Sequence, residues 1–152
     1  MTVHGLEMLD RTVQQTYCWI DELDRSLGWN DRHRSFRLLR AILHVLRDCL
    51  PIIENAQLAA QMPTLLRGVY FEQWRPGHVE PHRWTARRFV ACVEEAFTTD
   101  PLPDPAHAVG DVFRLLSLKI STGEIEDVLA CLPQQIHDLW IGSLVVASDE
   151  EC

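Results

Sequence analysis

The chain has 152 residues, of which 47% are hydrophobic and 24% charged, and its formal net charge is −8 at pH 7. This balance is typical of a single globular domain and excludes a disordered chain. No run approaches the roughly 18 apolar residues that cross a bilayer, so we expect no membrane segment. The five cysteines form no CxxC pair. They indicate reduced thiols and predict a cytoplasmic protein.

Charge is distributed unevenly along the sequence. Residues 1–29 carry a net charge of −3, residues 30–90 one of +5 and residues 91–152 one of −10. Opposite charges attract, so this polarity can draw the two halves of the chain together. It can equally steer an anionic partner to the middle segment.

Apolar residues recur at helical spacing, and no convincing strand pattern precedes the last ten residues. The first predicted helix spans residues 6–27 and ends at Gly28, a residue that suits the left-handed C-terminal cap. Its apolar face, which we expect to lie in the core, consists of Leu6, Leu9, Val13, Tyr17, Ile20, Leu23 and Leu27.

Three further helices follow in the first half. Asn30 or Asp31 is expected to cap the second helix, since both side chains accept hydrogen bonds from free backbone amides. Pro51 opens a short third helix, and Pro63 opens a fourth that reaches Gln73. Proline suits these starts because the first helical amides have no partner within the helix.

The second half is predicted to repeat this arrangement after a linker at residues 75–84, which is rich in proline and glycine. A helix starts near Thr85, and Asp104 caps the next one. Ser121 and Glu124 have the spacing of a capping box, in which each side chain accepts from the other residue's amide. The last helix is expected to end near Trp140.

A repeat with an offset of 70 residues underlies these predictions. No gap is needed between residues 19 and 70, and the identical pairs are Leu46 and Leu116, Glu54 and Glu124, Ala60 and Ala130, and Pro63 and Pro133. The sequence therefore predicts an all-α helical bundle of about eight helices in two pseudo-symmetric four-helix units. The single domain spans residues 1–142, with unit one at about 6–74 and unit two at about 85–140.

The acidic tail, residues 143–152, allows three interpretations. It packs on the body, adds as a strand to a partner, or is disordered; disorder of the acidic end is the favoured one.

The sharpest polar pattern lies on the second helix, where basic residues recur every three or four positions along one side. They are Arg34, Arg37, Arg40, His44 and Arg47. Three interpretations stand: a cationic groove for an anion or nucleic acid, a solvated face, or enclosed ion pairs. Apolar residues flank the stripe on both sides, which favours ion pairs. Candidate partners are Asp21, Glu22, Asp24 and Asp48.

The linker offers three candidate metal ligands, His78, Glu80 and His82. An extended backbone would point these alternate side chains to one side. Zinc commonly takes four ligands, however, and no CxxC or HExxH pattern completes the set. We therefore interpret the segment as an exposed linker and expect no metal and no cofactor.

Acidic residues crowd the start of the helix after Ser121, at Glu124, Glu126 and Asp127. Negative charge is favoured there by the helix dipole, so the sequence gives no reason to infer a metal. No nucleophile elbow, phosphate loop or catalytic carboxylate motif is present either. The sequence thus predicts no catalytic residue.

Several segments resemble one bacterial family, the domain of unknown function 2267. They are residues 28–32 (GWNDR), 39–48 (LRAILHVLRD), 65–74 (LLRGVYFEQW) and 121–128 (STGEIEDV). The resemblance covers about residues 5–140 and is most specific between Arg40 and Asp48. It implies an all-helical cytoplasmic protein of bacterial type, and it transfers no catalytic residue. The linker from His78 to His82 and the tail after Trp140 are peculiar to this chain.

These observations predict a non-enzymatic interaction or regulatory module that binds a protein partner or a second copy of itself. The alternative is binding of an anionic ligand or nucleic acid along the arginine stripe. Nucleic acid is the less favoured ligand because the second unit lacks a matching stripe. A metal-dependent enzyme at the linker histidines ranks third.

Overall fold

The structure, a computed structural model, describes residues 6–76 and 83–150, with side chains up to residue 145. These described residues form eight α-helices and contain no strand, which confirms the predicted all-α bundle. The helices are α1 (Glu7–Leu27), α2 (Arg32–Cys49), α3 (Ile52–Ala60), α4 (Thr64–Tyr70), α5 (Ala86–Glu94), α6 (Pro105–Lys119), α7 (Thr122–Cys131) and α8 (Gln134–Glu150). A short 3-10 helix, η3 (Glu95–Phe97), follows α5. Within the described ranges, no helix is both long enough and apolar enough to span a membrane.

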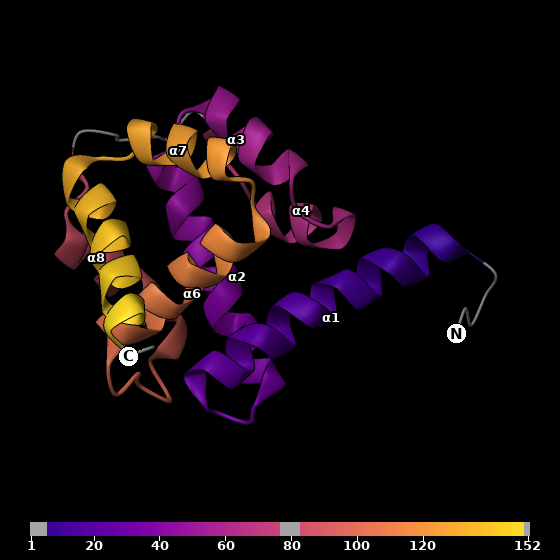
Figure 1. The fold of residues 1–152 in the computed structure, drawn as a ribbon, viewed down its shortest axis with the longest axis horizontal. Helices are drawn as coiled ribbons and strands as arrows, with labels where there is room; N and C mark the ends of the chain where they lie inside the picture. The colour runs from indigo at the N-terminus through magenta and orange to yellow at the C-terminus, as the bar shows by residue number, and fades with distance from the viewer. Residues whose placement is uncertain (1–5, 77–82, 151–152) are drawn as a thin grey trace.

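Helices α2 and α6 occupy the centre of the bundle (Figure 1). Helix α6 packs against α8 and α1, and α2 packs against α1 and α5. At one end, α3 lies beside α7 although the two are far apart in sequence (Figure 1). The central helices bury most of their apolar residues, so the core forms around them.

The side-chain caps predicted for α2, α6 and α7 are present in the structure. Asp31 accepts a hydrogen bond from the amide of Arg34 at 3.0 Å, and Asp104 caps α6 in the same way. Gly28 has φ of 69°, the left-handed conformation that glycine adopts without a steric cost, and it ends α1. Local side-chain chemistry therefore decides where these helices begin and end.

Burial recurs at the 70-residue spacing. Leu46 and Leu116 are both fully buried. The other buried pairs are Ile42 and Val112, Leu43 and Phe113, Leu50 and Ile120, Leu58 and Val128, Met62 and Leu132, and Leu66 and Ile136. Helix α2 ends at Cys49 and α6 at Lys119, again 70 residues apart. These matches fit the predicted repeat, while the pseudo-symmetry of the two units stays a prediction.

Three predicted helix features were wrong. Helix α4 ends at Tyr70 rather than Gln73, because Gln73 adopts φ of 54°. Helix α8 does not end at Trp140 but continues to Glu150. The capping box is half formed: Ser121 accepts from the amide of Glu124, but the Ser121 amide donates to Gln61 Oε1 at 2.8 Å.

A buried hydrogen-bond network joins the ends of α2, α3 and α4. The Asn55 side-chain amide donates to the carbonyls of Arg47 (3.0 Å) and Leu50 (3.2 Å), which lie at the C-terminal end of α2. The Tyr70 hydroxyl donates to Asn55 Oδ1. Asn55 and Tyr70 are both fully buried, so no solvent can replace these bonds.

Replacing Tyr70 by phenylalanine tests this network. The substitution leaves Asn55 Oδ1 buried without a donor, and we expect the free energy of unfolding to fall by about 1–3 kcal/mol. Urea denaturation followed by circular dichroism measures the change. Tyr17→Phe is the matched control, since Tyr17 is 49% exposed and should change stability by less than about 0.5 kcal/mol. Equal effects of the two variants would contradict the assignment.

Candidate functional site

The five residues of the predicted arginine stripe lie on α2, and each contacts groups of the protein itself. Arg34 and Arg37 reach toward Asp100, in the loop between η3 and α6. Arg40, His44 and Arg47 reach toward the end of α4. The stripe therefore connects α2 to two separate segments of the bundle.

Arg37 and Asp100 form the strongest of these contacts. The two guanidinium nitrogens donate to the two carboxylate oxygens at 2.7 and 2.8 Å, and a further bond reaches the Ala96 carbonyl. The hydrogen bond with Arg37 lowers the pKa of Asp100, and the same bond raises the pKa of Arg37. Arg34 donates to the backbone carbonyls of Asp100 and Pro101. The forked pair of Arg37 and Asp100 fixes the orientation of the two side chains as well as pairing their charges.

Arg47 is the most buried member of the stripe, at 7% exposure. It donates to the carbonyls of Tyr70 (3.0 Å) and Glu72 (2.7 Å), where α4 ends. A cation is favourable there because the last carbonyls of a helix lack partners. Arg40 pairs with the Glu72 carboxylate at 3.0 Å.

His44 is a half-buried imidazole whose Nε2 lies 2.7 Å from the Val69 carbonyl. Since a carbonyl only accepts, Nε2 carries the proton and donates. Burial lowers the pKa of His44 and favours the neutral ring. The arrangement matches a histidine with a structural hydrogen bond.

The predicted partners of the stripe were mostly wrong. Only Asp48 contacts it, with one oxygen 3.4 Å from Arg47. Asp21 pairs instead with Arg32, whose hydrogen bond lowers the pKa of that carboxyl. Glu22 pairs with Lys119. Asp24 accepts hydrogen bonds from the Ser35 hydroxyl and the Asp31 amide.

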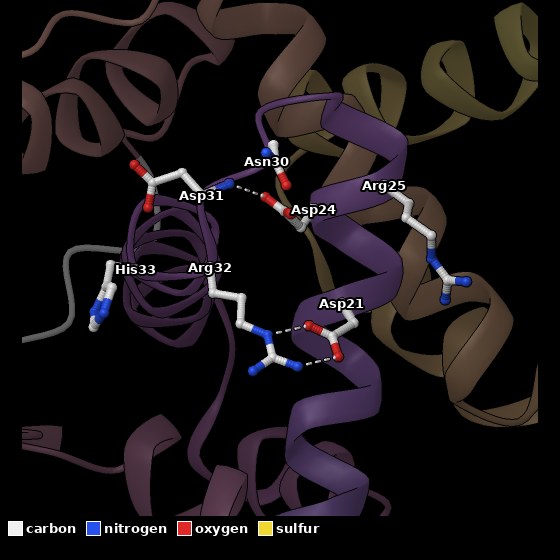
Figure 2. Close-up of a pocket in the computed structure, with 7 residues that line it drawn as sticks. All are labelled: Asp21, Asp24, Arg25, Asn30, Asp31, Arg32 and His33. Carbon is white, nitrogen blue, oxygen red and sulfur yellow. Dashed lines mark hydrogen bonds and ion pairs between the residues drawn. The ribbon is translucent and has the colours of Figure 1, made fainter.

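Figure 2 shows two of these contacts, Arg32 with Asp21 and the Asp31 amide with Asp24, at the corner between α1 and α2. The hollow there has a volume of about 720 Å³ and is lined by Asp21, Asp24, Arg25, Asn30, Asp31, Arg32 and His33. Arg32 points to Asp21, and the amide of Asp31 points to Asp24. Asp21 and Asp24 of α1 are therefore paired with the residues that begin α2, and these contacts hold the two helices together at this corner.

The candidate metal ligands His78, Glu80 and His82 lie outside the described residues. That prediction is neither supported nor contradicted by the structure.

The first half of α1 was predicted to lie in the core and does not. This half of the helix extends away from the bundle (Figure 1). The exposed fractions of the apolar residues there are 57% for Leu6, 71% for Met8, 50% for Leu9, 40% for Val13 and 49% for Tyr17. Only the later part of the predicted face, Ile20 and Leu23, is buried. A 21-residue helix is roughly 32 Å long, more than the bundle covers. The length of the predicted helix was therefore the feature of the sequence that could have indicated an uncovered end.

An apolar groove lies alongside this exposed face. It has a volume of about 530 Å³ between α1, α2 and α4. Its lining residues are Val13, Thr16, Tyr17, Ile20, Arg32, His33, Phe36, Leu65 and Val69. The groove and the exposed apolar residues on the side of α1 that faces it, Leu6, Leu9, Val13 and Tyr17, together form one apolar surface, which we call the α1 surface.

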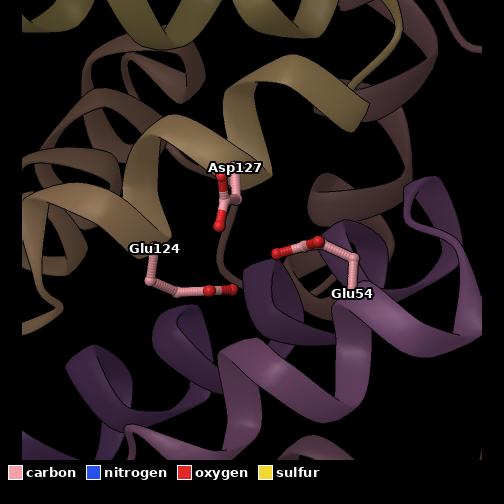
Figure 3. Close-up of side chains that lie close together, drawn as sticks. All are labelled: Glu54, Glu124 and Asp127. Carbon is pink, nitrogen blue, oxygen red and sulfur yellow. The ribbon is translucent and has the colours of Figure 1, made fainter.

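A second feature missed at the sequence level is a cluster of carboxylates between α3 and α7 (Figure 3). Glu54, Glu124 and Asp127 each place one oxygen so that all three atoms lie within 4.8 Å of one another. Glu54 and Glu124 are only 8% exposed. The sequence did contain an indication of this cluster, because Glu54 and Glu124 are an identical pair at the 70-residue spacing. The helix dipole explains negative charge at the start of α7, but it does not explain why Glu124 points at Glu54.

Burial raises the pKa of Glu124 to about 7, and hydrogen bonding and repulsion from Glu54 act in the same direction. A raised pKa means that the folded chain holds this proton more tightly than the unfolded chain does. The associated stability is complete below the unfolded value of 4.5 and is lost as the pH rises through about 7.

We therefore expect the Glu124→Gln variant to gain stability relative to the native chain as the pH rises from 5 to 8. The gain should be on the order of 1–3 kcal/mol. Urea unfolding at both pH values, with a chelator present, measures it. Glu126→Gln on the exposed side of the same helix is the control. A constant difference between native chain and Glu124→Gln at both pH values would contradict the assignment.

The fold and these surfaces define an all-α helical-bundle domain. A protein-family comparison matches residues 16–139 to the family described as uncharacterized conserved protein (DUF2267), and the chain belongs to this family. The match confirms the resemblance seen in the sequence. Among curated proteins, none matches the chain.

Proposed function

We propose that the protein is a non-enzymatic interaction module that binds through the α1 surface. The observation that carries this proposal is the exposure of four large apolar side chains, Leu6, Leu9, Val13 and Tyr17, along one side of the start of α1. Contiguous apolar patches on a protein surface usually mark a contact with another macromolecule.

The free cysteines Cys18, Cys49, Cys92 and Cys131 support a cytoplasmic location, as the sequence predicted. A bacterial origin likewise stays a prediction.

The occupant we propose is a second copy of the chain, with its α1 antiparallel to the first. With Val13 near the two-fold axis, Leu9 of each copy is level with Tyr17 of the other, and Leu6 is level with Ile20. Leu6, Leu9 and Val13 of one copy then each come level with an apolar residue that lines the groove of the other. A two-fold interface of this kind requires a surface that is complementary to itself.

Charge at the ends of the α1 surface supports the same pairing. Glu7 lies at the free end of α1, and Arg32 and His33 line the far end of the groove. In the antiparallel arrangement Glu7 of one copy comes beside His33 and beside Arg32, which also pairs with Asp21, of the other. Opposite charges at both ends favour this orientation over the parallel one, which would bring like ends together.

Glutamate substitutions on α1 test the assembly. We expect the native chain to sediment with twice the mass of one chain, and Leu9→Glu and Val13→Glu to sediment as monomers, because a buried unpaired charge opposes the contact. Leu118→Glu is the matched control, since Leu118 is 80% exposed on α6, outside the α1 surface. A native chain that stays monomeric at its highest soluble concentration would reject the second copy as the occupant.

Cysteine cross-linking tests the orientation. In a Cys18→Ser background, Val13→Cys should form a disulfide-linked dimer under mild oxidation, because residue 13 faces its own counterpart. Gln15→Cys should not, because position 15 points to the opposite side of the helix. Equal cross-linking of the two variants would exclude the antiparallel arrangement.

Binding of an anionic ligand or nucleic acid along the arginine stripe ranks second. The internal contacts of Arg34, Arg37, Arg40, His44 and Arg47 weaken it. A heparin column provides the test, and we expect the native chain to elute with the unbound fraction at low salt. Salt-sensitive retention that is lost in Arg37→Gln would restore this hypothesis.

A further inference from the structure

The carboxylate cluster between α3 and α7 combines burial with unmet polar groups. Glu54 comes from α3, and Glu124 and Asp127 come from α7 (Figure 3). Glu54 Oε1 and Glu124 Oε1 are fully buried and have no hydrogen-bond donor. Both side chains are more than nine-tenths buried and point into the space that the three carboxylates share.

No positive side chain of the described residues forms an ion pair with this cluster. The Cys131 thiol donates to Glu54 Oε2 at 3.9 Å, which is a weak hydrogen bond. A proton shared between Glu54 and Glu124 would still leave one negative charge on this buried pair, next to the exposed carboxylate of Asp127. Buried negative charge without a partner is costly, so the cluster needs a further positive group.

The geometry suits one divalent cation. Oxygen ligands lie about 2.0–2.6 Å from magnesium or calcium, so two ligands on opposite sides of the ion are about 4–5 Å apart. The three oxygens here all lie within 4.8 Å of one another. A set made of carboxylate oxygens favours magnesium, manganese and calcium over thiol-seeking metals. Asp127 is exposed, which leaves a path to solvent and room for water ligands.

We propose that Glu54, Glu124 and Asp127 form a binding site for a hard divalent cation that joins α3 to α7. The ion would link a residue of the first half of the chain to two residues of the second half. Its role is structural: it compensates the buried charge and holds the two helices together. The site does not depend on the α1 surface, so the two proposals succeed or fail separately.

Titration with manganese as the probe tests the site. We expect isothermal titration calorimetry at pH 8, on chain prepared without a histidine tag, to show one Mn²⁺ per chain. Glu54→Gln and Glu124→Gln should bind at least about tenfold more weakly. Glu126→Gln is the matched control, with the same charge change on the same helix, and should bind within about twofold of the native chain. Calcium and magnesium titrations then rank the ions.

Thermal unfolding gives a second readout that does not depend on calorimetric heats. An ion that binds only the folded chain raises its melting temperature, so Mn²⁺ should stabilise the native chain and Glu126→Gln but not Glu54→Gln. Because glutamine keeps the shape of glutamate, the variants should fold, and their circular dichroism verifies this. The proposal is overturned if the native chain binds no stoichiometric ion at pH 8. It is also overturned if Glu54→Gln binds and responds to Mn²⁺ as the native chain does.

Discussion

The enclosure of α2 is the constraint on which the rest of the bundle depends. This helix is apolar on both sides of its basic stripe, so packing it at the centre buries Arg47 and partly covers Arg34, Arg37 and His44. A buried guanidinium group needs partners, and Arg47 finds them at the end of α4, while the partly exposed Arg37 binds Asp100 in the loop before α6. Those contacts place α4 and the start of the second half relative to α2. The uneven charge along the sequence is realised here, since Arg37 of the basic middle segment binds Asp100 of the acidic segment.

This constraint also separates structural charge from charge that is available for function. The stripe has the residue types of an anion-binding surface, but its donors are directed at the protein's own carbonyls and carboxylates. The carboxylates between α3 and α7 are the opposite case, with acceptors that no donor meets. The apolar residues of α1 lack a partner in the same sense. Both proposals therefore rest on groups that the fold leaves unsatisfied.

Local features of the structure were predictable wherever a short-range interaction decides them. Asp31 caps α2 and Gly28 ends α1, because the hydrogen bonds and backbone angles involved span only a few residues. The core positions of α2, such as Leu46, followed from helical periodicity. The ion-pair partner of Arg37 could not be predicted, because Asp100 is 63 residues away along the chain and several acids were equally plausible from the sequence. The end of α8 was missed because no proline or cap marked it.

The sequence by itself determined the all-α class, most helix starts and the family, because these depend on periodicity, caps and local motifs. Tertiary structure alone decided which apolar face stays uncovered and which charges meet. Leu9 and Leu23 belong to the same stripe of α1, yet only the part of the helix that lies over the bundle is buried. Glu54 and Glu124 are identical residues at the 70-residue spacing, but only the packing of α3 on α7 brings their carboxylates together. Periodicity specifies a side of a helix, whereas burial and charge pairing depend on what packs against it.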